Sequence, residues 1–199
     1  MRPLLLTDWG TCLKTRDRKL VVSDQDSGTS RAYLPAEFRY DSVIVENLGG
    51  FVTFPALRWL ASNGVSLTAL GFNGEVLGQW LPEAPTNGPL RLAQLKAHLN
   101  PRERLRVARW VLKQKLGRNV REPARTVNDL LIIEAQEADR YWRSLGVTRD
   151  YPHARDPVNA CLNYAYGLLY SRARLSIHRV GLDPTVGFLH VPRSERPSA

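Results

Sequence analysis

Cysteine is scarce in this 199-residue sequence, and long hydrophobic runs are missing. The two cysteines, Cys12 and Cys161, are too few for a disulfide framework or a four-cysteine zinc module. The longest charge-free stretches, 59–74 and 157–171, are too short and too polar for a transmembrane helix. The first residues enter a strand-like segment directly and show no signal-peptide pattern. We therefore expect a cytoplasmic protein with reduced thiols.

Acidic residues are too few to balance the basic ones only in the second part of the chain. Residues 1–85 contain 8 lysines and arginines against 9 aspartates and glutamates, whereas residues 86–199 contain 20 against 10. The net charge of +9 therefore comes from the second part. A one-sided excess of this kind attracts polyanions. We expect nucleic acid as the partner, with an anionic membrane surface as the weaker alternative.

Three common catalytic motifs are also missing: a glycine-rich phosphate loop, a His-Glu-x-x-His zinc motif and a nucleophile elbow. The composition, 43% hydrophobic and 24% charged, is ordinary for a globular protein and excludes wholesale disorder. The candidate functional residues are therefore few, and they do not belong to any of these motifs.

The hydrophobic pattern divides the chain in two. Within residues 1–80, short apolar runs between turn residues predict strands, and 55–63 predicts one short helix. Asn73-Gly74 indicates a hairpin. Residues 81–89, rich in proline, are predicted to be a linker. Residues 90–199 show helical periodicity with capping signals. We expect an α+β protein with an N-terminal, mostly antiparallel β domain containing one short helix, followed by an α-helical domain.

Glu134 and His190 are the candidates for chemistry in the helical part. Glu134 lies beside an apolar stripe of its helix, where a carboxylate is costly unless it pairs with an arginine or binds a metal. His190 follows a helix stop in a glycine-rich segment, which suits a ligand or general base. Its alternative is a hydrogen bond to a backbone carbonyl. The other histidines are expected at surface or helix-face positions: His98, His153 and His178.

The helix predicted from residue 101 to about 119 is strongly basic, with Glu103 as its one acid. One face of it carries four basic residues: Arg102, Arg106, Arg109 and Lys113. The mutual repulsion of these charges favours a phosphate backbone as their counterion. A solvated helix surface is the alternative.

The last predicted helix carries a polar line formed by Asn159, Asn163 and Tyr166. Polar groups in such a line usually cap or bond neighbouring backbone within the fold. Support of Glu134 or His190 is the functional alternative for these three residues.

Several short segments form a recognisable series along the chain. They are Leu130–Ala135, Tyr141-Trp142, Arg155–Ala160, Leu162–Tyr166, Gly181–Pro184 and Gly187–His190, with looser matches at Thr53–Leu60 and Asn63–Val65. This series resembles the CRISPR-associated integrase family, the larger subunit of the spacer-acquisition complex, also described as a metal-dependent DNA endonuclease. The resemblance covers essentially the whole chain.

The resemblance implies that Glu134 and His190 are the catalytic metal ligands, in a helical catalytic domain. Their oxygen and imidazole donors suit Mg²⁺ or Mn²⁺. The family's third ligand is an aspartate in a segment after the histidine, and the sequence reaches Ala199 without it. We therefore expect the chain to be C-terminally truncated, with this domain incomplete. Glu195 and Asp183 are the alternatives for the third ligand.

The resemblance also implies a function in antiviral defence, the insertion of short foreign DNA fragments into a CRISPR repeat array by strand transfer, with nicking as the same chemistry. It implies a homodimer through the β domain, a small ferredoxin-like CRISPR-associated partner subunit, and DNA held along the basic helix. Two alternatives stay open. One is a catalytically inactive DNA-binding remnant of this family, and the other is a mobile-element integrase of the same superfamily.

Overall fold

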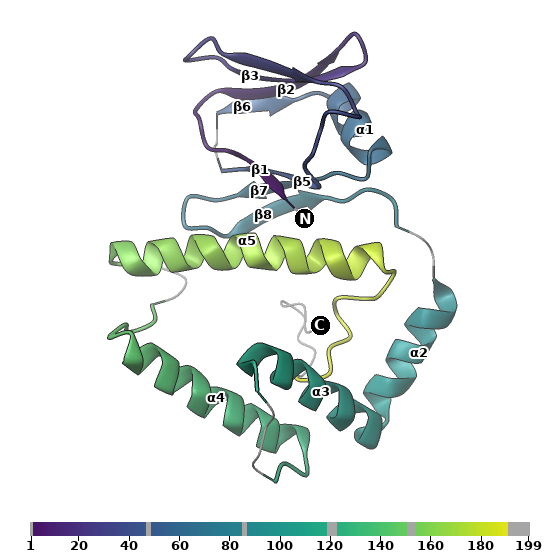
Figure 1. Ribbon diagram of the computed structural model, residues 1–199, viewed down its shortest axis with the longest axis vertical. Helices are drawn as coiled ribbons and strands as arrows, with labels where there is room; N and C mark the ends of the chain where they lie inside the picture. Colours follow the sequence, from purple (N-terminus) through teal and green to yellow (C-terminus); the bar gives the residue numbers. More distant parts are fainter. Residues whose placement is uncertain (1, 47–48, 85–86, 119–122, 151–153, 191–199) are drawn as a thin grey trace. The chain divides into compact units, whose positions relative to one another are not determined.

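The computed structural model of the chain is drawn in Figure 1. It describes residues 2–46, 49–84, 87–118, 123–150 and 154–190. Strands and one helix occupy the part up to residue 80, and longer helices follow. Among the helices of the described residues, none is long and apolar enough to cross a membrane.

The first of two four-stranded sheets is mostly parallel. Its strand order is β1 (Pro3–Leu6), β5 (Ser42–Val45), β7 (Ser66–Leu70) and β8 (Val76–Trp80). The strands β1, β5 and β7 run parallel, and β8 returns antiparallel to β7. The hairpin predicted at Asn73-Gly74 is confirmed. Gly74 has a φ of +79°, which glycine adopts without strain.

The second sheet is mostly antiparallel. Its order is β4 (Ser30–Tyr33), β3 (Lys19–Asp24), β2 (Thr11–Arg16) and β6 (Gly50–Val52). Only β6 pairs in parallel, with β2, among the described pairings of this sheet. Asp17 and Arg18 form the β2–β3 turn with φ values of 50° and 63°, as a two-residue hairpin turn requires. The sequence did not predict β6, because three residues are too few to show a pattern.

The α+β class predicted from the sequence is confirmed, but the strand directions are mixed. In the described sheets, three pairings are parallel (β1–β5, β5–β7 and β2–β6) and three are antiparallel. The parallel pairing of β5 with β7 follows from α1 (Phe54–Ser62), which lies between these two strands in the chain. A helical crossover returns the second strand parallel to the first.

The core of this part lies between the two sheets and α1. Trp59 and Leu60 of α1 are buried in it, and the Trp59 indole Nε1 donates to the Arg18 carbonyl at 3.0 Å. This bond ties the β2–β3 turn to the helix. The other buried members of the cluster are Leu13, Leu20, Phe38, Val43, Ala56 and Val65.

Four further helices follow in the described residues. They are α2 (Gly88–Leu99), α3 (Pro101–Leu116), α4 (Val127–Ser144) and α5 (Pro157–Arg179). Capping residues close to each helix terminus determine where several of these helices begin or end. Asn100 caps α3, and Gly117 ends it in a left-handed conformation. Thr126 and Asp129 form a capping box at the start of α4, and the Asp156 carboxylate accepts from the Asn159 N–H in α5.

The chain folds into two compact units. Unit 1 contains Met1–Glu83 and Asp150–Leu175, and unit 2 contains Ala84–Arg149 and Ser176–Ala199. This division differs from the predicted one, which ended the β domain at residue 80, made 81–89 a linker and grouped all of 90–199. The difference comes from α5, because most of this helix packs with the strands of unit 1.

Two glycines let α5 approach the β7–β8 hairpin with backbone against backbone (Figure 1). A Cβ atom at Gly167 would lie 2.0 Å from the Gly74 carbonyl oxygen, and one at Gly74 would lie 2.5 Å from the Tyr164 nitrogen. The Gln79 side chain on β8 donates to the Ser171 carbonyl of α5 at 2.9 Å. Only glycine permits this approach, so α5 is an integral part of unit 1.

Replacing Gly167 by alanine should lower the free energy of unfolding by about 2–4 kcal/mol, because the new methyl group meets a backbone carbonyl that cannot rotate away. This loss exceeds the gain of about 1 kcal/mol in helix propensity. Urea denaturation followed by circular dichroism measures it. Gly78→Ala is the matched control, since nothing lies within 4 Å of a Cβ there. An unchanged midpoint for Gly167→Ala would contradict the close approach.

Candidate metal centre and DNA-binding surface

Glu134 lies at the edge of the α4 face that packs into the core of unit 2. Leu130 and Ile133 of α4 are buried in this core with Ala108 and Leu112 of α3. Because Glu134 follows Ile133 directly, its side chain is held at the rim of the core and is only 13% exposed. A carboxylate with so little solvent requires cationic or hydrogen-bonding partners.

Two groups from different elements contact the Glu134 carboxylate. The Lys115 Nζ of α3 donates to Oε1 at 2.5 Å, and the His190 Nε2 lies 3.6 Å from Oε2. The two residues singled out in the sequence are therefore brought together. The ion pair considered as the alternative for Glu134 is also present, with a lysine in place of an arginine. The His190 side chain is 59% exposed, so it is open to a ligand.

The donors at this position fit a small, hard cation. Glu134 offers carboxylate oxygens and His190 an imidazole nitrogen, a combination that Mg²⁺ and Mn²⁺ accept. The Lys115 ammonium already places a positive charge on the carboxylate. In the part of the chain that the structure describes, no third His, Cys, Asp or Glu completes a cluster. Glu195 lies outside the described residues.

Polar side chains of α2 and α3 fix the loop that carries His190. The buried Gln94 donates to the carbonyls of Asp183 and Val186, both at 2.8 Å, and accepts from the Asp183 N–H at 2.9 Å. Three more side chains donate to carbonyls of this loop: Arg91 to Gly181, His98 to Gly187, and Arg104 to Phe188 and His190. We call Arg91, Gln94, His98 and Arg104 the loop clamp.

Asp183 stabilises the start of the same loop. Its Oδ1 accepts from the Thr185 hydroxyl at 2.6 Å and from the Thr185 N–H at 2.8 Å. These bonds, with a smaller contribution from the charge of Arg91, lower the pKa of Asp183. Because the folded-state pKa is the lower one, the stabilisation is present above about pH 4 and is lost as the pH falls through the lowered pKa. At neutral pH the turn is therefore intact. Among the described residues, Asp183 does not form a metal-binding cluster with Glu134 and His190.

The roles of the loop clamp and of Lys115 were not predicted from the sequence. His98 was predicted to be a surface or helix-face residue without a role, yet its Nδ1 donates to the Gly187 carbonyl at 2.6 Å. The available signal was the spacing of Arg91, Gln94 and His98, which puts three polar side chains on one face of α2. For Lys115 the signal is non-local, because its partner lies 19 residues further along the chain.

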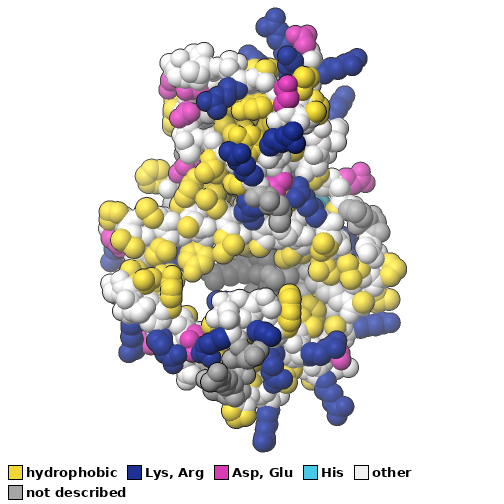
Figure 2. Space-filling view, in the orientation of Figure 1, with side chains coloured by type: hydrophobic (Ala, Val, Ile, Leu, Met, Phe, Trp, Pro, Cys, Tyr) yellow, Lys and Arg dark blue, Asp and Glu magenta, His cyan; other side chains and the backbone are white. Residues whose placement is uncertain are grey.

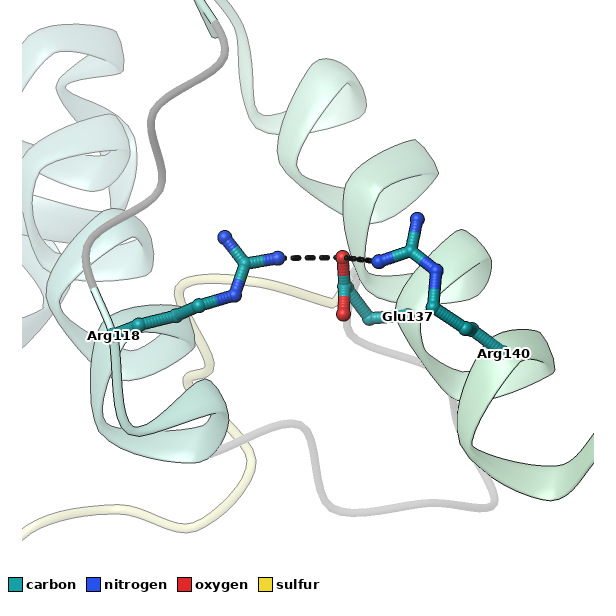
Figure 3. Close-up of polar contacts among 3 residues, drawn as sticks. All are labelled: Arg118, Glu137 and Arg140. Carbon is teal, nitrogen blue, oxygen red and sulfur yellow. Dashed lines mark hydrogen bonds and ion pairs between the residues drawn. The ribbon is translucent and has the colours of Figure 1, made fainter. Parts of the chain in front are cut away.

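A second ion-pair cluster joins α4 to Arg118, which lies just after the end of α3. The Glu137 Oε1 accepts from both Arg118 and Arg140 at 2.6 Å, and Figure 3 shows the two guanidinium groups on either side of the carboxylate. The Glu137 side chain is 18% exposed. Two cations sharing one carboxylate leave a net positive charge on this cluster, and the Arg118 bond ties the segment after α3 to α4.

The four basic residues predicted to bind DNA differ in their local partners. Arg106 pairs with Glu103 at 2.6 Å, and Arg109 donates to the Ala124 carbonyl. Within the described ranges, Arg102 and Lys113 are exposed and form no salt bridge. Figure 2 shows lysine and arginine side chains exposed over α3 and α4. Of these four residues, Arg102 and Lys113 are therefore the most accessible to a DNA phosphate.

Asn159, Asn163 and Tyr166 belong to unit 1, whereas Glu134 and His190 belong to unit 2. Asn159 fixes the start of α5, because its Oδ1 accepts from the Asp150 N–H and its Nδ2 donates to Asp156. Asn163 is also buried, and Tyr166 is exposed. The structure thus gives Asn159 a local role. A supporting role of the three residues at the metal centre stays a prediction.

Known proteins resemble this chain over its whole length. A CRISPR-associated endonuclease Cas1 from Pyrobaculum aerophilum is 28% identical over 98% of this chain and 75% of its own. One from Neisseria meningitidis is 30% identical over 98% of this chain and 67% of its own. A casposase bound to its integration product has a similar structure, with a TM-score of 0.83, 25% identity and coverage of 100% of this chain and 67% of the casposase.

The family comparison agrees with these similarities. The model of the family described as CRISPR associated protein Cas1 matches residues 4–123 and 118–199. The match includes residues of both units, among them Glu134, His190 and the loop clamp. The chain therefore belongs to the family of CRISPR-associated Cas1 proteins.

Proposed function

We propose that this chain is a metal-dependent DNA integrase and endonuclease, which inserts short DNA fragments into a CRISPR repeat array by strand transfer. The observation that carries the proposal is the meeting of Glu134 and His190 at 3.6 Å in a chain of the Cas1 family. The relatives named as endonucleases and the casposase solved with an integration product support the two reactions.

Glu134 and His190 are the residues that would hold the metal. Mg²⁺ or Mn²⁺ bound there would activate an attacking hydroxyl and stabilise charge on the leaving oxygen. Helix α4 limits the movement of Glu134, because its neighbouring side chains are buried. The loop clamp limits the movement of His190 through the carbonyls of Gly187, Phe188 and His190 itself. This rigidity matters, since a misplacement of about 1 Å can cost on the order of 10²-fold in rate.

Exposed positive charges of α3 would place the DNA. Arg102 and Lys113 are open to a phosphate, and the excess of 20 basic over 10 acidic residues in 86–199 attracts the duplex from a distance. Strand transfer forms one phosphodiester bond as another breaks, so it needs no energy source. Positioning of the two DNA segments is then the main task of the protein.

Unit 1 supplies the surfaces for assembly in this proposal. It exposes the aromatic side chains of Trp9, Phe51, Phe54 and Phe72, and residues 1–85 carry almost equal numbers of acidic and basic residues. Such a surface suits protein contacts better than DNA contacts. We propose a homodimer through the β-sheet unit, together with a small ferredoxin-like CRISPR-associated partner subunit.

The similarity to the casposase favours a second candidate function, integration by a mobile-element enzyme at a target outside a CRISPR array. The same residues would carry it. Strand-transfer assays that compare a CRISPR repeat target with an unrelated duplex of equal length distinguish the two. Preference for the repeat supports the first function, and equal use of both targets supports the second.

Glu134→Gln and His190→Ala should each lower Mn²⁺-dependent nicking and strand transfer by at least about 100-fold, because each removes a donor from the proposed metal site. Labelled oligonucleotides resolved on denaturing gels measure both reactions. Glu137→Gln is the control, since it changes a carboxylate of the same helix that is paired with two arginines. An equal loss in this control would mean that the effect is structural.

The double replacement of Arg102 and Lys113 by alanine should weaken duplex binding regardless of sequence. The slope of log affinity against log salt should flatten by about 0.9 for each lost phosphate contact. Fluorescence anisotropy at several salt concentrations gives this slope. A double replacement of the exposed Lys14 and Arg16 in unit 1 removes the same charge and should leave the slope unchanged. Identical slopes for both variants would show that α3 is only a solvated surface.

Gln94→Leu should lower the free energy of unfolding by about 1–3 kcal/mol, because it leaves three backbone groups of the loop without their partner. Strand transfer should fall more than DNA affinity, since His190 loses its position. Thermal denaturation and the gel assay measure the two effects. The exposed Gln114 on α3 offers the matched control, Gln114→Leu. A fully active and stable Gln94→Leu protein would show that the clamp does not position His190.

A further inference from the structure

Two ion pairs link α4 to the end of α3 and the residue just beyond it, with the same spacing. Lys115 contacts Glu134 and Arg118 contacts Glu137, and in each pair the acid lies 19 residues after the base. The pairs differ in how firmly the acid is held. Two guanidinium groups hold Glu137 (Figure 3), whereas a single ammonium group holds Glu134 and its other oxygen faces His190. The cation on Glu134 is therefore the replaceable one.

We propose that Lys115 is an internal counter-cation of Glu134, which a divalent metal ion displaces, and that the displaced ammonium group then binds a DNA phosphate. This inference rests on the proposed metal site at Glu134 and His190. It gives Lys115 two successive partners. Before the metal binds, Lys115 neutralises the carboxylate, and afterwards it adds a positive charge to the surface of α3.

The exposure of the two side chains decides which of them moves. Glu134 is 13% exposed and held at the rim of the core, whereas Lys115 is 55% exposed on a flexible stem. The ammonium group of Lys115 stays largely hydrated in the pair, so it loses little by leaving once another cation takes its place. A divalent ion carries twice the charge and can bind the carboxylate and the imidazole together. The ion therefore replaces the ammonium group while Glu134 stays in place.

The displaced charge stays close to the site, because the stem of Lys115 is fixed on α3. An ammonium group is a compact charge that pairs readily with phosphate. Arg118 is not released in the same way, since Glu137 is not a ligand in this proposal. Metal and DNA should therefore bind cooperatively through Lys115, each raising the affinity for the other by the same factor.

The first test measures Mn²⁺ binding to the whole chain without DNA, by electron paramagnetic resonance of the free ion. Lys115→Met should bind Mn²⁺ roughly 3- to 10-fold more tightly than the native protein, because the competing cation is gone. Lys115→Gln should show the same direction. Lys115→Arg keeps the cation and should change the affinity less than about 2-fold. Unchanged affinity in both Lys115→Met and Lys115→Gln would overturn the inference.

Two controls separate this inference from the proposed metal site. Arg118→Met removes one positive charge three residues after Lys115, but from the Glu137 pair, so Mn²⁺ affinity should stay within about 2-fold. A gain as large as that of Lys115→Met would show a general charge effect and refute the displacement. Glu134→Gln should weaken Mn²⁺ binding at least about 10-fold. If it does not, the proposed metal site itself is wrong.

The second test follows duplex affinity against salt concentration, with and without Mn²⁺. With Mn²⁺, the native protein should have a salt slope steeper by about 0.9 than Lys115→Met, which corresponds to one additional phosphate contact. Without Mn²⁺, the two slopes should be equal, because Lys115 is then bound to Glu134. Equal slopes in both conditions would refute the phosphate contact of the displaced lysine.

Discussion

A loop without regular secondary structure carries His190, and its backbone polar groups must be paired by other parts of the chain. The loop clamp provides these partners, and the Gln94 amide alone serves three of the groups. Leu189 adds an apolar anchor, because it is buried in the core of unit 2 with side chains of α3 and α4. The distance between His190 and Glu134 depends on these contacts. Every chemical role proposed for the centre depends on them in turn.

Charge pairing in unit 2 is uneven, and the two mostly buried carboxylates of α4 differ in their partners. Glu137 has two arginine partners and ties α4 to the segment that follows α3. Glu134 has one lysine partner and faces an exposed imidazole. Both carboxylates are mostly buried, so burial alone does not distinguish them. What distinguishes them is whether the partner can leave without breaking the packing of the helices.

Signals from neighbouring residues predicted the helices and most of the strands. They did not predict contacts between residues far apart in the chain. Caps such as Thr126 and Asp156 are read from neighbouring residues, so the helices were predicted in their observed order. Strand direction depends on crossovers, and the clamp joins residues of α2 to a loop that begins at Gly181. Neither has a short-range signal. The pairing of Glu134 with His190 was predicted from the family resemblance, because periodicity shows only that Glu134 borders an apolar stripe.

The discontinuity of unit 1 has a consequence for folding during synthesis. The strands up to residue 83 leave the ribosome well before Asp150–Leu175, with which they form one unit. At about 5–20 residues per second, the roughly 90 residues from 84 to 175 take about 5–20 s to synthesise. During that time the β7–β8 hairpin lacks α5, and its face around Gly74 and Gln79 is uncovered. The two units must therefore finish folding in an interleaved order, and a fragment that ends after β8 lacks the helix that completes unit 1.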